Sequence, residues 1–282
     1  MLKTNHPLVD IQWLRHNLDD SNLVLLDASV PGVVPGYKSI NEKGQFAAIP
    51  GARRFDYDQQ VCKSNSSLPH MMPTAEHFEA EVRKLGISQD SVIVVYDDVG
   101  LYASPRAWWM FRAMGHQQVV VLDGGLPAWI EAGNEISNLY AEAEPGDFRA
   151  NPIEDLFCDF NVVLKALDDE GCRILDARSA GRFKGLEAEP RPGVREGHMP
   201  NALNLPFPEV LNGGSLKSAA ELREIFARVV APDKKVITCC GSGITACILT
   251  LAANVAGYEK LSVYDGSWAE WGLPSKLPVV TT

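Results

Sequence analysis

The sequence has no block of lysines or arginines, and its formal charge is −10, with 26 Lys and Arg against 36 Asp and Glu. A strongly acidic chain without a basic patch does not attract nucleic acids or anionic membrane surfaces. Long apolar runs are also absent, as is the apolar core of a signal peptide near the N-terminus. We therefore expect a cytoplasmic protein with neither a nucleic acid nor a membrane as partner.

Paired cysteine motifs are absent as well. The six cysteines form no Cys-x-x-Cys pair and no spacing typical of a disulfide framework; they are Cys62, Cys158, Cys172, Cys239, Cys240 and Cys247. Free thiols in a reducing compartment are the simplest interpretation. With 282 residues and 46% hydrophobic content, the chain is long enough for two domains with ordinary cores.

What the sequence does contain is a long internal repeat. Three segments of the first half recur in the same order in the second half: 23–28 in 173–178, 49–52 in 199–202, and 122–125 in 264–267. Collinear matches over this length indicate a duplicated domain rather than a solenoid of short repeats. We place a first domain at 1–140, a linker at 141–157 and a second domain at 158–282, because 138–157 is rich in Ala, Glu, Pro, Asp and Asn and has weak periodicity.

Each copy alternates strand-like and helix-like segments. Residues 91–96 form a continuous apolar run typical of a buried strand, and a helix is predicted at 104–114. Further helices are predicted at 75–85 and 219–230, where apolar residues share one face. The expected fold class is α/β, with tandem duplicated domains that are each a mainly parallel sheet flanked by helices.

The most informative stretch follows the strand predicted at 236–238, where two glycines lie on the turn into a helix that begins near Ala246. Glycines admit unusual backbone conformations, so successive N–H groups can converge on one anion, and the helix adds the positive end of its dipole. Cys240 opens this turn, and such a setting favours the nucleophilic thiolate. We therefore predict Cys240 as the nucleophile. The alternative is that it is a small buried hydrophobe, which we prefer for Cys239 in the preceding strand.

The two copies differ at this position. Alignment on the shared strand places Asp97 where the second copy has Cys240. Because a carboxylate cannot replace a thiolate nucleophile, we expect the first copy to be catalytically inert and to supply one wall of a cleft.

The chain resembles the rhodanese superfamily over nearly its whole length, and the most specific residues lie in the second copy. The residues that carry it are Cys-Gly-Ser-Gly-Ile-Thr-Ala at 240–246 and Tyr-Asp-Gly-Ser-Trp at 264–268. Members that use thiosulfate typically have Cys-Arg-Lys-Gly-Val-Thr, whereas members that use 3-mercaptopyruvate have Cys-Gly-Ser-Gly-Val-Thr. By this match the loop residues that contact the donor are Gly241, Gly243, Ile244 and Thr245, with Ile244 in place of valine.

The chemistry of the donors agrees with the uncharged loop. Thiosulfate is a dianion, so its site gains from cations beside the nucleophile. 3-Mercaptopyruvate has its carboxylate and ketone remote from the sulfur, which favours forked donors farther away. Residues 181–191 resemble the family's substrate-binding segment, which implies that Arg182 and Arg191 bind these groups. Without that resemblance, the segment is typical of a solvated loop of mixed charge.

The resemblance also implies a relay among Asp58, His70 and Ser242. Asp58 and His70 come from segments of the first copy, Phe-Asp-Tyr-Asp at 55–58 and Pro-His-Met-Met-Pro at 69–73, and Ser242 comes from the loop. A lone histidine in a polar loop is otherwise more often simply exposed.

The implied reaction is sulfur transfer in two halves. Cys240 takes the sulfur of 3-mercaptopyruvate, pyruvate leaves, and the Cys240 persulfide passes sulfur to a thiol, a thioredoxin-like protein or cyanide. The reaction requires no metal and no organic cofactor. The alternatives are a thiosulfate:cyanide sulfurtransferase and a non-enzymatic sulfur carrier. A Cys-dependent phosphatase needs an arginine that closes the loop, and Ala246 and Cys247 stand there instead.

Overall fold

The computed structural model describes residues 2–30, 39–43 and 46–281. The chain divides into two compact units. Unit 1 comprises Met1–Ser64, Met72–Ile153 and Gly213–Leu216, and unit 2 comprises Asn65–Met71, Glu154–Asn212 and Lys217–Thr282.

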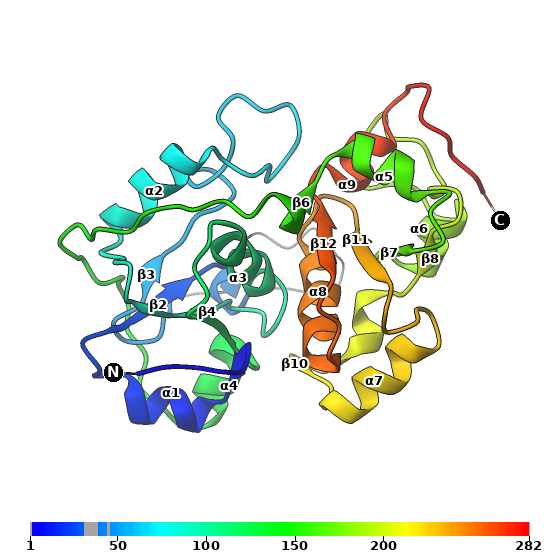
Figure 1. The fold of residues 1–282 in the computed structure, drawn as a ribbon. Coiled ribbons are helices and arrows are strands. Elements are labelled where there is room, and N and C mark those ends of the chain that lie inside the picture. The colour runs from blue at the N-terminus through cyan, green and yellow to red at the C-terminus, as the bar shows by residue number, and fades with distance from the viewer. Residues whose placement is uncertain (1, 31–38, 44–45, 282) are drawn as a thin grey trace. The chain divides into compact units, whose positions relative to one another are not determined.

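Unit 1 is built around a five-stranded sheet in the order β1-β5-β4-β2-β3. Strands β2, β3 and β4 of this sheet are labelled in Figure 1. Each pair of neighbouring strands is parallel. In chain order the elements are β1 (Leu8–Val9), α1 (Ile11–Asn17), β2 (Leu23–Asp27), the 3₁₀ helix η1 (Ile40–Lys43), β3 (Arg53–Arg54), α2 (Ala75–Lys84), β4 (Val92–Tyr96), α3 (Ser104–Ala113), β5 (Val119–Leu122) and α4 (Gly125–Glu131).

Helices cover both faces of this sheet. On one face, Leu14 of α1 and Trp129 of α4 pack against alternate strand residues such as Val94. On the other, Phe78 of α2 and Phe111 of α3 form an edge-to-face pair at 5.1 Å. Burial of apolar side chains on both faces explains why the strands are nearly continuous apolar runs.

Unit 2 repeats this plan with a sheet in the order β6-β12-β11-β7-β8, again with parallel neighbours. Its elements are η2 (Glu154–Leu156), β6 (Phe157–Cys158), α5 (Phe160–Ala166), β7 (Cys172–Asp176), α6 (Ala180–Lys184), β8 (Leu203–Asn204), η3 (Phe207–Val210), β9 (Leu211–Asn212), α7 (Ala219–Ala227), β11 (Lys235–Cys239), α8 (Thr245–Ala256), β12 (Leu261–Tyr264) and α9 (Ser267–Trp271). The intervening strand β10 (Ser215–Leu216) lies among the residues of unit 1.

The helices of unit 2 also lie on both faces of its sheet. Val163 of α5 and Trp268 of α9 share one apolar cluster with Ile174, Ile237 and Cys239. On the other face, α8 packs against α7, β11 and β12. The expected α/β class of two mainly parallel sheets flanked by helices is therefore confirmed, as is the prediction that Cys239 packs into a core.

The segment 141–153, which we assign from sequence to a linker, contains no helix or strand but is not a free spacer. Phe148 is fully buried and lies 5.8 Å from the ring of Phe78. The backbone N–H of Gly146 donates to the carbonyl oxygen of Arg83 at 2.8 Å. These residues therefore pack as part of unit 1.

Strand register makes Asp97 and Cys240 equivalent positions. In unit 1, Asp27 pairs with Tyr96, and in unit 2, Asp176 pairs with Cys239. The residue that follows the central strand is therefore Asp97 in one unit and Cys240 in the other.

Among the described residues, no helix is long and apolar enough to cross a bilayer.

Candidate active site

The candidate nucleophile lies on the loop between β11 and α8, at the carboxyl end of the central strand of unit 2. Cys240 directly follows the strand and is 2% exposed. Gly243 has φ +81°, in the left-handed region that glycine adopts without steric cost. This glycine allows the chain to turn sharply from the strand into the helix.

The loop holds Cys240 through backbone contacts on both sides. The N–H of Gly243 donates to the Sγ of Cys240 at 3.1 Å. From α9, the N–H of Trp268 donates to the Cys240 carbonyl oxygen at 2.9 Å. The 12-residue helix α8 has no side-chain cap at Ile244, so the positive end of its dipole is available to an anionic sulfur at Cys240.

The equivalent loop of unit 1 shows what such a loop binds. The carboxylate of Asp97 fills it, with Oδ1 accepting two backbone N–H groups and Oδ2 accepting three. The donors are the N–H groups of Val99, Gly100, Tyr102, Ala103 and Ser104, at 2.8 to 3.1 Å, and the Ser104 hydroxyl also donates at 2.7 Å. The loop of this fold is therefore an anion site, which unit 1 fills with its own carboxylate.

Two arginines lie over the Cys240 loop. A Cβ atom at Gly241 would lie 3.1 Å from Nη2 of Arg182 and 3.8 Å from Nη1 of Arg191. Arg182 belongs to the short helix α6, and Arg191 follows it in the chain. The structure thus brings both predicted arginines to the residue after Cys240, and the absence of a side chain at Gly241 gives them room.

The corresponding edge of the unit 1 sheet has two carboxyl groups beside an arginine. A cavity of about 320 Å³ is lined there by Asp27, Ser29, Arg54 and Asp98, among others. Burial, followed by the carboxylates of Asp27 and Asp97, raises the pKa of Asp98. This shift favours the neutral form of Asp98, so this edge differs from the loop of unit 2, over which two arginines lie.

The remaining residues of the loop are buried. Ser242 is 5% exposed, and Ile244 and Thr245 are similarly buried. Ser242 is two residues from Cys240 in the same turn. Whether these residues contact a donor stays a prediction.

Asp58 and His70 belong to different units. Asp58 is partly buried in unit 1, and its Oδ2 accepts a hydrogen bond from Gln59 Nε2 at 2.9 Å. His70 belongs to the short segment Asn65–Met71 of unit 2 and has φ +58°, a left-handed conformation. The proposed relay of these two residues with Ser242 stays a prediction.

Ser267 is a site residue that the sequence reasoning did not select. Its Oγ accepts the Cys240 N–H at 3.2 Å and donates to the Tyr264 carbonyl oxygen at 2.8 Å. Ser267 is fully buried and has φ +48°. Its hydroxyl therefore connects the start of α9 to the Cys240 loop. The signal was available, because Ser267 lies in the Tyr-Asp-Gly-Ser-Trp motif at 264–268 that carries the family resemblance.

The other buried thiols are poor competitors for Cys240. All six cysteines are free. Burial raises the pKa of Cys158 to about 11 and that of Cys239 well above its ordinary value. Neither forms much thiolate near neutral pH. Among the described residues, no group of three or more His, Cys, Asp or Glu side chains is placed to hold a metal ion.

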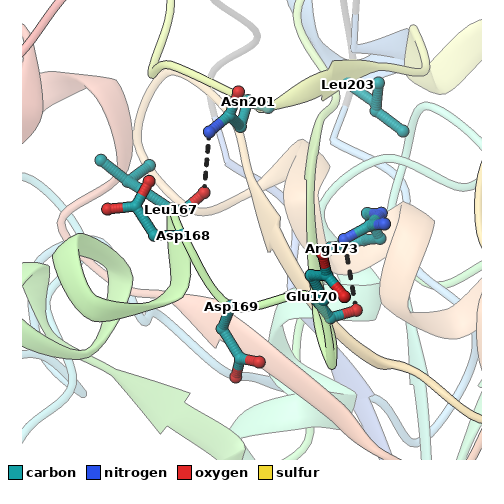
Figure 2. Close-up of a pocket in the computed structure, with 8 residues that line it drawn as sticks. Leu167, Asp168, Asp169, Glu170, Arg173, Asn201 and Leu203 are labelled. Carbon is teal, nitrogen blue, oxygen red and sulfur yellow. Dashed lines mark hydrogen bonds between the residues drawn. The ribbon is translucent and has the colours of Figure 1, made fainter.

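A further cavity of unit 2 lies away from this loop. It has a volume of about 470 Å³ and is lined by residues such as Leu167, Asp169, Glu170 and Leu203 (Figure 2). Arg173, near the start of β7, also lines it, whereas the Cys240 loop follows the carboxyl end of the neighbouring strand. This cavity takes no part in the site at Cys240.

Comparison with known proteins identifies the family. The rhodanese-like domain family matches residues 10–132 and 159–273. A 3-mercaptopyruvate sulfurtransferase of Escherichia coli (strain K12) is 38% identical over 274 residues, covering 96% of each chain. A thiosulfate sulfurtransferase of Rattus norvegicus is 37% identical over 274 residues, covering 94% of this chain and 91% of its own.

Solved structures agree with this result. The crystal structure of SseA from Escherichia coli, described as a 3-mercaptopyruvate sulfotransferase, superimposes with a TM-score of 0.82 at 35% identity. The match covers 94% of this chain and 100% of that one. The chain belongs to the rhodanese family and contains two rhodanese-like domains in tandem, as the resemblance of its loop indicates.

Proposed function

We propose that this protein is an enzyme that transfers the sulfur of 3-mercaptopyruvate through a persulfide on Cys240. The observation that carries the proposal is the position of Arg182 and Arg191 over Gly241, next to a thiol that receives a backbone N–H. A thiol beside paired guanidinium groups fits a donor with sulfur at one end and a carboxylate at the other. The relative from Escherichia coli is named for the same donor.

The first half-reaction follows from this arrangement. The Cys240 thiolate attacks the donor sulfur, an S–S bond forms, and the bond from sulfur to C3 of the donor breaks. The electron pair of the broken bond moves onto the ketone and forms the enolate of pyruvate. This enolate takes a proton at C3 and leaves as pyruvate. In this mechanism Arg182 and Arg191 hold the carboxylate and the developing enolate oxygen, and Ser242, His70 and Asp58 handle the proton.

The second half-reaction removes the outer sulfur. The N–H of Gly243 and the dipole of α8 stabilise the anionic persulfide until an acceptor arrives. The acceptor is a thiol, a thioredoxin-like protein or cyanide. Six free cysteines support a reducing, cytoplasmic location.

The first domain, residues 1–140, supplies no nucleophile in this proposal, and its chemical part is limited to the proton relay of Asp58 and His70. Asp97 cannot form a persulfide, and its carboxylate already fills the loop of unit 1. The second domain, residues 158–282, then carries the nucleophile and both arginines, with residues 141–157 between the two.

A thiosulfate sulfurtransferase is the second candidate. Arg182 and Arg191 would also attract a sulfur dianion, and the relative from rat is named for that donor. The loop itself, however, offers no charged side chain beside Cys240. Cations beside the transferred sulfur would stabilise bound thiosulfate, and the loop supplies none of its own. The uncharged loop therefore favours 3-mercaptopyruvate.

Mass spectrometry of the protein incubated with each donor tests the proposal. We expect 3-mercaptopyruvate to add one sulfur atom to the peptide that contains Cys240 and to release pyruvate. The Cys240→Ser variant is the control, and it should gain no sulfur. Sulfur gained only from thiosulfate would favour the second candidate, and sulfur gained on another cysteine would contradict the role of Cys240.

A further inference from the structure

A buried network of four charged side chains lies beside the Cys240 loop. It consists of Asp176, Arg178, Glu189 and Arg182. The side chains of Arg178, Asp176 and Glu189 are 0%, 1% and 4% exposed, and that of Arg182 is 16% exposed. Their formal charges sum to zero, which is how buried charges are normally tolerated.

Arg178 is the fixed centre of this network. Its Nη2 donates to Asp176 Oδ2 at 2.6 Å and to the Gly197 carbonyl oxygen at 2.8 Å, and its Nη1 donates to Glu189 Oε1 at 2.7 Å. Its guanidinium carbon lies 4.1 Å from the ring centroid of Trp268. Burial acts to lower the pKa of Arg178, but Asp176 and Glu189 raise it further, so the group stays charged.

Glu189 connects this fixed arginine to Arg182. The Nε of Arg182 donates to Glu189 Oε1 at 3.2 Å, and its Nη2 donates to Oε2 at 2.5 Å. A forked pair of this kind fixes the plane of a guanidinium group as well as its position. Because Glu189 occupies the Nε and Nη2 edge, the Nη1 and Nη2 edge of Arg182 remains for a ligand at Gly241.

Trp268 ties the network to the nucleophile loop. Its ring stacks on Arg178, and its backbone N–H holds the Cys240 carbonyl oxygen. The chain of contacts from Cys240 through Trp268, Arg178 and Glu189 to Arg182 is therefore continuous. By contrast, no ion pair of Arg191 is recorded in the described part of the chain.

We propose that Glu189 is a positioning residue that aims one edge of Arg182 at the donor carboxylate over Gly241. The inference rests on the proposed use of 3-mercaptopyruvate. Glu189 does not touch the donor and acts through Arg182. Without its carboxylate, Arg182 would keep its charge but lose its fixed orientation, so donor binding would weaken more than the chemical step.

The test compares Glu189→Gln with the matched control Glu187→Gln. Glu187 lies two residues away on the same segment, is exposed, and bonds the Ser179 hydroxyl instead of Arg182. For Glu189→Gln we expect KM for 3-mercaptopyruvate to rise about ten- to a hundredfold, with kcat far less affected. The control should keep wild-type values.

Persulfide formation from inorganic polysulfide provides the second measurement, because that donor has no carboxylate. Glu189→Gln should form the Cys240 persulfide from polysulfide at the wild-type rate, which a general loss of structure would not allow. An unchanged KM for 3-mercaptopyruvate overturns the inference. Equal losses with both donors overturn it as well.

A double-mutant cycle shows whether Glu189 acts through Arg182. In an Arg182→Ala background, Glu189→Gln should change KM by less than about twofold, because interacting residues are not additive. Full additivity contradicts the inference. If Glu189→Gln does not fold, Glu189→Asp carries the test, since it keeps the charge but shortens the reach: a raised KM supports the inference and a wild-type KM overturns it. Failure of the wild-type protein to take sulfur from 3-mercaptopyruvate would contradict the proposed function instead.

Discussion

Gly241→Ala is the smallest change that tests the position of the arginines. The new Cβ would lie 3.1 Å from Nη2 of Arg182, closer than an ordinary van der Waals contact. The backbone at Gly241 is outside the left-handed region, so alanine meets no backbone strain there. Apart from its chain neighbours, the nearest atoms that the new methyl group would meet are those of the two guanidinium groups.

The structure sets the size of the effect. Arg182 has to move by a few tenths of an ångström, but Glu189 holds its Nη2 at 2.5 Å. Hydrogen bonds to charged groups are worth about 1.5–3 kcal/mol, so partial misalignment costs about 1–1.5 kcal/mol. That corresponds to a fall of about tenfold in kcat/KM for 3-mercaptopyruvate.

Steady-state pyruvate release over a range of donor concentrations measures this effect. Gly171→Ala is the matched control, because its Cβ meets only the side chain of exposed Asp169, at 3.0 Å. We expect the free energy of unfolding of both variants to lie within about 0.5 kcal/mol of the wild-type value. A folded Gly241→Ala variant with wild-type kcat/KM would refute the placement of Arg182 and Arg191 over the loop.

Three further predictions follow from other parts of the molecule. Arg182→Lys and Arg191→Lys keep the charge but lose the fork, so each should cost about 1.5–3 kcal/mol in transition-state binding; wild-type kcat/KM would place these arginines outside the site. Asp97→Ala leaves five backbone N–H groups of a buried loop without an acceptor, so it should lower the free energy of unfolding in urea by at least about 3 kcal/mol, while folded protein still transfers sulfur; an unchanged stability would show that the carboxylate does not hold the loop. Burial raises the pKa of Cys158 from 9.0 to about 11, so its contribution to stability is full below about pH 9 and is lost as the pH rises through about 11, by up to about 3 kcal/mol; Cys158→Ala should weaken this pH dependence, and an identical pH profile of urea unfolding would contradict it.

Local patterns were enough to predict much of this fold. The helices at 75–85 and 219–230 begin where the sequence indicates, and they end at Lys84 and Ala227. After Ala227 the backbone N–H groups of Arg228 and Val229 bond three residues back instead of four, so the regular α-helix ends before the predicted boundary. The strand before Cys240 and the helix after it were predictable because an apolar run, two glycines and a second apolar run follow one another within about two dozen residues.

Other features depend on contacts between distant segments. Glu189 lies in a segment of mixed charge that is typical of a solvated loop, yet it is buried against Arg178, and Trp268 packs on Arg178 from α9, far away in the sequence. No local periodicity encodes such a network. The carboxylate of Asp97 was predicted to be inert, but its role as the anion of its own loop required the backbone geometry.

A single-turnover measurement tests the central claim most directly. Wild-type protein is mixed with excess 3-mercaptopyruvate and no acceptor, and released pyruvate is compared with the sulfur bound at Cys240. We expect a burst of one pyruvate per chain with an equal amount of Cys240 persulfide, and no burst from Cys240→Ser. If the Cys240→Ser variant released a burst of pyruvate as large as that of the wild-type protein, the account would be contradicted.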